Sequence, residues 1–122
     1  MKGIDIYDVT QTRVYGRYHD NVFSFNINQD EFERIAANDM KSFALEMHDA
    51  YSLYTEAKLD AEDAIAELDI EKGNMKDVSL ALKRSFDTMQ AERQKWIRYE
   101  MLCHAVEWFV KYRPLYKEKW LD

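Results

Sequence analysis

Three side chains able to bind metal or move protons align on one helical segment near the C-terminus. Glu100, His104 and Glu107 are spaced four and three residues apart, so a helix would place them on one face. Di-iron bundles take a Glu-x-x-His pair from each of two helices, whereas here the order is reversed and occurs once. Lys111 continues the row with the acid–base spacing typical of a solvated helix face. We therefore expect a solvated face, without a metal or cofactor.

A second acidic pair, Glu46 and Asp49, has Glu-x-x-Asp spacing. All-helical nucleotide pyrophosphohydrolases of the MazG type place such a pair after a Glu-x-x-Glu pair on the preceding helix, and the four carboxylates bind magnesium and phosphate. This chain has no Glu-x-x-Glu pair at suitable spacing before Glu46, so it is similar to only half of the motif. A metal-dependent helical nucleotide hydrolase is therefore kept as an alternative function.

Nucleophilic catalysis has little support in the sequence. The only cysteine, Cys103, falls on a row of apolar residues, which predicts a core thiol rather than a reactive one. A single cysteine also excludes an internal disulfide and a cysteine-based zinc cluster. The chain contains neither a glycine-rich phosphate loop nor a nucleophile elbow. These observations indicate a protein that is not an enzyme.

Basic and aromatic residues interleave in the C-terminal region, as they do in grooves that bind single strands. From Arg93 to the C-terminus seven bases outnumber four acids, a net charge of +3. Most of the rings here, Trp96, Tyr99 and Trp108 among them, fall on apolar rows and predict core positions. Single-stranded nucleic-acid binding is therefore an alternative function, and it would use Arg113, Tyr116, Lys117, Lys119 and Trp120.

Negative charge gathers in the middle of the chain. From Glu56 to Lys72 seven acids outnumber two lysines, a net of −5 within a whole-chain charge of −6. Such a run can be the solvated flank of a helix, or a row of carboxylates that imitates nucleic-acid phosphates and occupies a basic groove on a partner. The predicted partner-binding residues are the acids of this run: Glu56, Asp60, Glu62, Asp63, Glu67, Asp69 and Glu71.

Residues 1–27 are predicted to form a small antiparallel β-unit. The alternation of Phe23, Phe25 and Ile27 with polar residues is typical of a half-buried strand. We expect a hairpin that pairs 13–18 with 22–27, to which 4–9 could add a third strand. An isolated hairpin is unstable in water, so this unit must pack against helices.

Two long helices are predicted to follow, over 28–72 and 74–113. Asn28 and Glu31 form a capping-box pattern at the start of the first, and Gly73 ends it. A weak point falls at Asn38-Asp39. Both helices carry apolar residues at alternating three- and four-residue spacing, which predicts an antiparallel hairpin, with Ser85 and Glu92 interrupting the second seam. Pro114 ends the second helix, and residues 114–122 could form a short C-terminal helix.

The expected fold is thus mostly α, of the α+β class, in one domain of 122 residues. A second apolar stripe, which includes Met101, Ala105 and Trp108, needs a cover that either the β-unit or a second copy of the chain could provide. We favour a homodimer, because a helical hairpin of about 60 Å exposes much of its seam.

The composition places this chain in the cytoplasm rather than in a membrane. The longest apolar-rich stretch, 96–112, is interrupted by charged residues, and the N-terminus resembles no export signal. We expect a non-enzymatic module that binds another protein through its acidic helical surface. Short proteins of this kind are frequent among phage and mobile-element products that inhibit host nucleases or defence proteins, so such an inhibitor is the favoured hypothesis.

Overall fold

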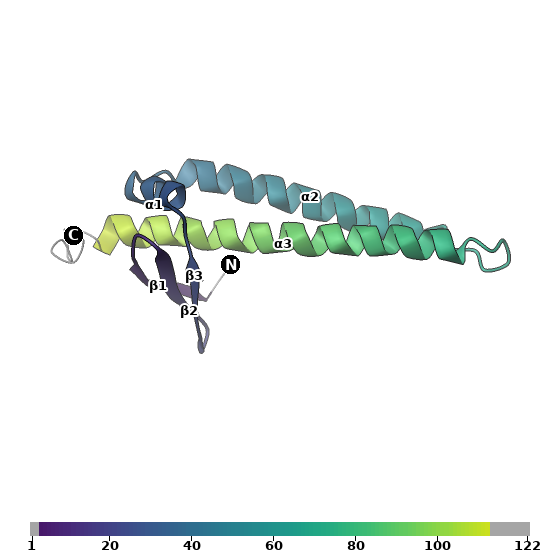
Figure 1. The fold of residues 1–122 in the computed structure, drawn as a ribbon, viewed down its shortest axis with the longest axis horizontal. Helices are drawn as coiled ribbons and strands as arrows, with labels where there is room; N and C mark the ends of the chain where they lie inside the picture. Colours follow the sequence, from purple (N-terminus) through teal and green to yellow (C-terminus); the bar gives the residue numbers. More distant parts are fainter. Residues whose placement is uncertain (1–2, 113–122) are drawn as a thin grey trace. The chain divides into compact units, whose positions relative to one another are not determined.

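Alternating apolar and polar residues produce a three-stranded antiparallel sheet at the N-terminus. The computed structural model describes residues 3–112, and its strands are β1 (Ile4–Val9), β2 (Arg13–Tyr18) and β3 (Asn21–Asn26), in the order β1-β2-β3 (Figure 1). The pairing register of β1 shifts between Ile6 and Asp8, so that Val9 joins Ile4 and Ile6 among the buried side chains. The predicted hairpin and its third strand are confirmed.

Gly16 in β2 makes room for an aromatic ring on β3. It pairs with Phe23, and a Cβ atom built on Gly16 would lie 2.5 Å from Cζ of that ring. The same Cβ would lie 3.0 Å from the carbonyl oxygen of Asp5 on β1. Phe23 in turn stacks on Phe25, with ring centroids 6.3 Å apart. Glycine is therefore required here by the close approach of neighbouring groups.

The first helix, α1 (Gln29–Ala36), begins with the predicted capping box. The Asn28 Oδ1 accepts the Glu31 N–H at 2.7 Å, and Glu31 Oε1 accepts the Asn28 N–H at 3.0 Å. Each of these side chains thus satisfies a backbone donor that the helix leaves without an intrahelical acceptor.

The chain breaks its helical path at the predicted weak point. Asn38 adopts a left-handed backbone with φ of 60°, and its N–H donates to the Ile35 carbonyl at 3.1 Å. The Asp39 N–H donates to the Arg34 carbonyl at 2.9 Å, which completes a Schellman closure. The prediction of one continuous helix over 28–72 is therefore wrong, because a second helix starts after this closure.

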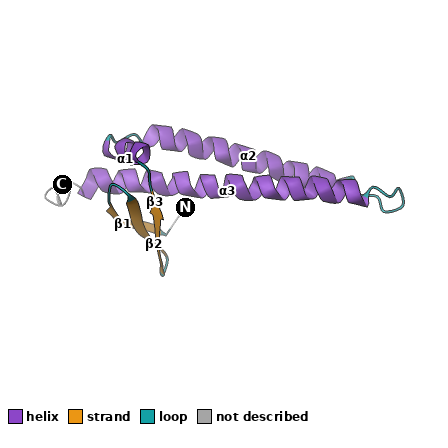
Figure 2. Cartoon of the chain, viewed as in Figure 1, coloured by secondary structure: helices purple, strands orange, loops and turns teal. Residues whose placement is uncertain are grey.

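The remaining helices are α2 (Met40–Ala66) and α3 (Met75–Tyr112), so helices take up most of the described residues (Figure 2). The chain divides into two compact units, the first formed by Met1–Leu45 with Tyr99–Asp122 and the second by Glu46–Arg98. Both boundaries fall inside helices, and each unit has its own buried residues.

The first unit has a continuous apolar core built from the sheet, α1 and the ends of α2 and α3 that belong to it. Its fully buried side chains are Val9, Val14, Ile35, Phe43, Leu102 and Val106. In the second apolar stripe predicted on α3, Ala105 is buried in this core, and Met101 and Trp108 pack against it. The sheet therefore helps to cover this stripe. This is one of the two covers considered from the sequence, the other being a second copy of the chain.

In the second unit α2 and α3 run antiparallel and pack along the predicted seam (Figure 1). The rings of Tyr51 and Tyr54 contact Trp96, with centroids 4.9 and 5.9 Å apart. All the buried residues of this unit are small: Ala50, Ala57, Ala61, Ala64 and Val78. The seam of this unit is therefore filled by small side chains.

The turn between α2 and α3 is longer than predicted. Helix α2 ends at Ala66, whereas the sequence pattern placed its end at residue 72. Asn74 directly precedes α3, where a capping residue would lie, but its Oδ1 accepts the Asp69 N–H at 2.8 Å and its Nδ2 donates to the Glu67 carbonyl at 2.7 Å. Gly73 adopts φ of 73° within this turn, but it lies seven residues after the end of α2, so the prediction that it ends the first long helix is wrong.

The short C-terminal helix predicted for 114–122 lies outside the described residues. Within 3–112, no helix is both long enough and apolar enough to span a membrane.

Candidate functional site

Four of the seven predicted partner-binding acids lie on one helix face. Glu56, Asp60 and Asp63 belong to α2, and Glu67 directly follows it at the same spacing of four, three and four residues. The Glu67 N–H still donates to the Asp63 carbonyl at 3.0 Å, so the helical path extends to this residue. All four side chains are exposed.

Asp49, the second member of the Glu-x-x-Asp pair with Glu46, extends this row by one further carboxylate. It lies seven residues before Glu56 and is exposed, so it occupies the same face two turns earlier. Heptad spacing would have identified Asp49, but the density of acids begins only at Glu56. We define the acidic face as Asp49, Glu56, Asp60, Asp63 and Glu67.

The other three predicted acids lie elsewhere. Glu62 is two residues from Asp60, which places it about 200° around the helix from that carboxylate. Asp69 and Glu71 belong to the turn. The Asp69 Oδ1 accepts the N–H groups of Glu71 and Lys72 at 3.0 and 3.3 Å, so this carboxylate organises the turn.

The acidic face is not neutralised by neighbouring bases in the part of the chain that the structure describes. Within residues 3–112, its carboxylates take part in no ion pair or side-chain hydrogen bond. Like charges face each other at Glu56–Asp60 and at Asp63–Glu67, where each pair destabilises a helix by about 0.2–0.5 kcal/mol. The acidic face therefore lowers the stability of α2.

The helix dipole adds to this cost. The first turn of α2 has no acid and its last turn has no base, so neither end turn carries the charges that would stabilise the helix. Asp63 and Glu67 lie at the C-terminal end, where each negative charge costs about 0.3–1 kcal/mol. Selection for stability alone would favour basic residues at this end of the helix.

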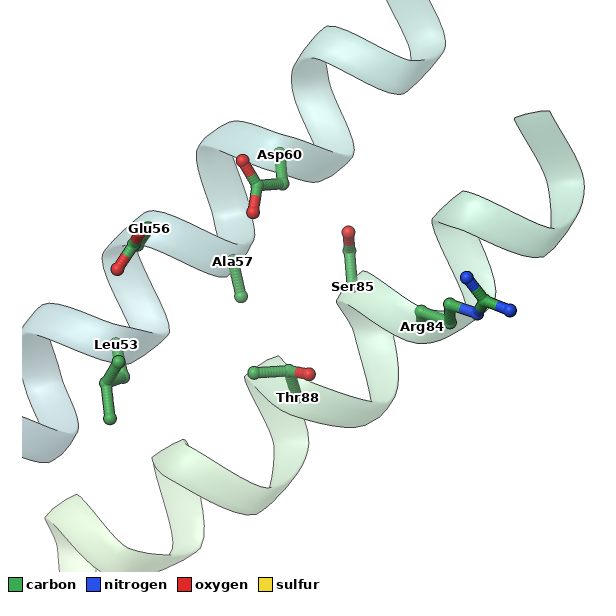
Figure 3. A pocket seen from close by; sticks show the side chains of 7 residues that line it. All are labelled: Leu53, Glu56, Ala57, Asp60, Arg84, Ser85 and Thr88. Carbon is green, nitrogen blue, oxygen red and sulfur yellow. The ribbon is translucent and has the colours of Figure 1, made fainter. Parts of the chain in front are cut away.

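A hollow of about 330 Å³ opens beside the acidic face, between α2 and α3 of the second unit (Figure 3). It lies where Ala57 faces Ser85, the predicted interruption of the α3 seam, because two small side chains leave space between the helices. Figure 3 shows Arg84 extending away from α2. The lining residues are Leu53, Glu56, Ala57 and Asp60 from α2 and Arg84, Ser85 and Thr88 from α3.

The row of Glu100, His104 and Glu107 lies in the first unit and is only partly solvated. The His104 side chain is 30% exposed and that of Glu107 is 66% exposed, with 3.9 Å between Nδ1 and Oε2. Glu100 is half-buried, so the fully solvated face expected here is wrong for two of the three residues. Among residues 3–112, no group of three or more His, Cys, Asp or Glu side chains is placed to hold a metal ion.

Cys103 is half-buried and packs against the core of the first unit, as expected for a core thiol. Burial raises the pKa of this thiol above its usual value, and the negative charge of Glu107 raises it further. A raised pKa keeps the thiol protonated at neutral pH, which lowers its nucleophilicity.

The residues predicted for single-strand binding lie outside the described part of the chain: Arg113, Tyr116, Lys117, Lys119 and Trp120. Nucleic-acid binding by these residues stays a prediction. Within 3–112, Trp96 and Tyr99 are half-buried and Trp108 packs against the core, in agreement with their assignment to apolar rows.

Comparison of the chain with protein-family models, with curated proteins and with solved structures finds no significant match.

Proposed function

We propose that this protein is a non-enzymatic interaction module that binds a basic surface of another protein through the acidic face. The observation that carries the proposal is the position of this face: five exposed carboxylates in one row, without compensating bases among the described residues, that end at the wrong pole of the helix dipole. Sequence features that oppose local stability are expected at functional sites. A binding role would account for this arrangement of carboxylates.

The hollow beside the acidic face supports a partner rich in lysine or arginine. These side chains combine an apolar stem with a charged head. The stem would pack against Leu53 and Ala57, and the head would reach the carboxylates of Glu56 and Asp60 at the edge of the hollow. A single hollow of about 330 Å³ is large enough for one such side chain, which would give the interface a defined register.

A groove that binds nucleic acid is one basic surface that would fit. From Glu56 to Glu67 four carboxylates cover about 16.5 Å of helix axis, or roughly 5.5 Å per charge, against about 3.4 Å per phosphate along one DNA strand. The row is therefore a sparser line of negative charge than a DNA strand. We propose inhibition of a host nuclease or defence protein in the cytoplasm, by a phage or mobile-element product, as the form of this function.

The experiment is affinity capture from extracts of the native host with three forms of the full chain. One is unmodified, one carries Asp60→Asn, Asp63→Asn and Glu67→Gln, and the control carries Glu62→Gln, Glu71→Gln and Asp87→Asn. The control also removes three negative charges, but from exposed positions outside the acidic face. The proposal expects a protein captured by the unmodified chain and the control but lost with the first variant. Equal capture by all three forms would contradict it.

A further inference from the structure

A second hollow, of about 230 Å³, lies between strand β1 and helix α3 in the first unit. Strand β1 contributes three consecutive residues to its lining, Ile4, Asp5 and Ile6. Successive side chains of a strand point to opposite faces, so a hollow lined by three residues in a row lies at the backbone edge of β1. The α3 wall is made by residues of one helix face: His104, Glu107, Trp108, Lys111 and Tyr112.

The pairing pattern of the sheet directs two backbone units of β1 to its open edge. In the sheet β1 pairs only with β2, so its other edge has no neighbouring strand among the described residues. The His19 N–H donates to the Gly3 carbonyl at 3.1 Å, and the Asp5 carbonyl oxygen also lies against β2. In an antiparallel ladder, alternate residues make the bonds to the neighbouring strand. The N–H and C=O groups of Ile4 and Ile6 therefore point away from β2.

These backbone groups need hydrogen-bond partners. Ile4 and Ile6 are only 8 and 9% exposed, and within residues 3–112 their backbone forms no hydrogen bond beyond the pairing of β1 with β2. A nearly buried N–H or C=O group is paired either with water or with another chain. The open edge of a strand is a template for a further strand. The hollow therefore offers two donors and two acceptors to an extended chain.

We propose that this hollow binds an extended peptide segment of another protein, which adds a strand beside β1 and directs an arginine side chain to α3. Its main chain bonds to the edge groups of Ile4 and Ile6, as in other cases of strand addition to a sheet edge. A second copy of the chain fits less well. The edge of its own β1 is lined by its own α3 wall, which would have to enter the same space.

Charge and ring contacts of the α3 wall favour the arginine. The Glu107 side chain is 66% exposed and is followed by the Trp108 ring, while His104, 3.9 Å away, carries a charge only when protonated. Lys111 holds its Nζ 5.2 Å from the centroid of the Tyr112 ring, so its charge lies over that ring. A guanidinium group can pair with a carboxylate and stack on an aromatic ring at the same time.

This site lies in the first unit, whereas all residues of the acidic face lie in the second. The inference therefore does not depend on the proposed function. Substitutions in the acidic face should leave peptide binding unchanged, so the two proposals can fail separately.

Nuclear magnetic resonance titration of the full chain tests the proposal. The probe is a peptide blocked at both ends, threonine-valine-arginine-valine-threonine, whose β-branched residues favour an extended backbone. The amide signals of Ile4 and Ile6 should shift and gain protection from hydrogen exchange, with a dissociation constant of about 1 mM or lower. The same peptide with every backbone nitrogen methylated has no backbone donors, so its dissociation constant should be at least about tenfold higher.

Glu107→Gln should raise the dissociation constant at least about threefold. Its matched control is Asp20→Asn, which removes one negative charge from an exposed turn of the same unit and should leave binding within about 1.5-fold. Both positions are exposed, and circular dichroism checks that each variant folds.

Sedimentation equilibrium without peptide shows whether a second copy occupies the edge. The proposal is overturned by unshifted Ile4 and Ile6 amides at about 5 mM peptide. Equal binding of the methylated peptide, equal effects of the two substitutions, or a dimer that protects these amides without peptide would each overturn it as well.

Discussion

The side chain of Asn74 accepts the Asp69 N–H with its Oδ1 at 2.8 Å, and this bond closes the turn between α2 and α3. The same amide donates its Nδ2 to the Glu67 carbonyl at 2.7 Å, immediately after the last residue of α2. The C-terminal end of α2 is thus capped by the side chain of Asn74, which directly precedes the next helix. The end of the acidic face at Glu67 is fixed by the same contact.

Asn74→Ala should destabilise the chain by about 0.5–1.5 kcal/mol, because it removes two hydrogen bonds of the turn, one part-buried and one exposed. Urea denaturation followed by circular dichroism measures the change in the free energy of unfolding. Gln90→Ala, at an exposed position within α3, serves as the control and should stay within about 0.5 kcal/mol of the unmodified chain. An equal effect of both substitutions would exclude a special role for Asn74.

Neutralising the C-terminal part of the acidic face should stabilise the chain. Asp63→Asn and Glu67→Gln each remove a negative charge from the negative end of the α2 dipole, a gain of about 0.3–1 kcal/mol per residue at low salt. Thermal unfolding at low and high salt measures this gain in stability, and high salt should reduce it because the salt screens the charges. Glu62→Gln is the control, because Glu62 has Lys58 four residues before it. A loss of stability with Asp63→Asn and with Glu67→Gln would contradict this prediction and would show that these two carboxylates stabilise the fold.

Gly16→Ala should destabilise the first unit by about 1–3 kcal/mol, since the new methyl group would overlap the Phe23 ring and approach the Asp5 carbonyl oxygen. Chemical denaturation measures the loss. The combination with Phe23→Leu should recover part of it, because the shorter side chain removes the closest contact. No recovery would mean that the Asp5 backbone, rather than the ring, sets the limit.

The Cys103 thiol should react slowly with a disulfide reagent such as Ellman's reagent near neutral pH. Burial raises its pKa and Glu107 adds to the shift, so the thiolate that reacts is scarcer than in the unfolded chain. The neutral thiol is favoured by folding, so its contribution to stability is full below the unfolded-state pKa and is lost as pH rises through the folded-state pKa. Rates measured with and without urea check this, and a faster reaction of the folded chain would contradict it.

Local signals in the sequence predicted the elements and much of their packing. The Phe23-Phe25-Ile27 alternation, the Asn28–Glu31 capping pattern and the weak point at Asn38 each depend on neighbouring residues, and each is present in the structure. The seams were predicted for the same reason, because three- and four-residue spacing determines which side chains share a helix face.

The features that the sequence did not predict depend on contacts between distant residues or on single side-chain conformations. Asn74 has the residue type of a helix cap, and only the fold of the turn directs its amide to Asp69. Likewise, the acidic run from Glu56 to Glu71 suggested one surface, but the end of α2 at Ala66 separates Asp69 and Glu71 from the acidic face. Asp49 belongs to this face although it lies outside the acidic run.

The most direct test of the acidic face is a binding titration of the captured partner with the full chain. The dissociation constant should rise at least about tenfold for the variant with Asp60→Asn, Asp63→Asn and Glu67→Gln, and more salt should weaken binding of the unmodified chain. The control with Glu62→Gln, Glu71→Gln and Asp87→Asn should bind within about twofold of the unmodified chain. Equal weakening by both variants would mean that net charge, rather than the acidic face, determines binding, and would contradict the proposed function.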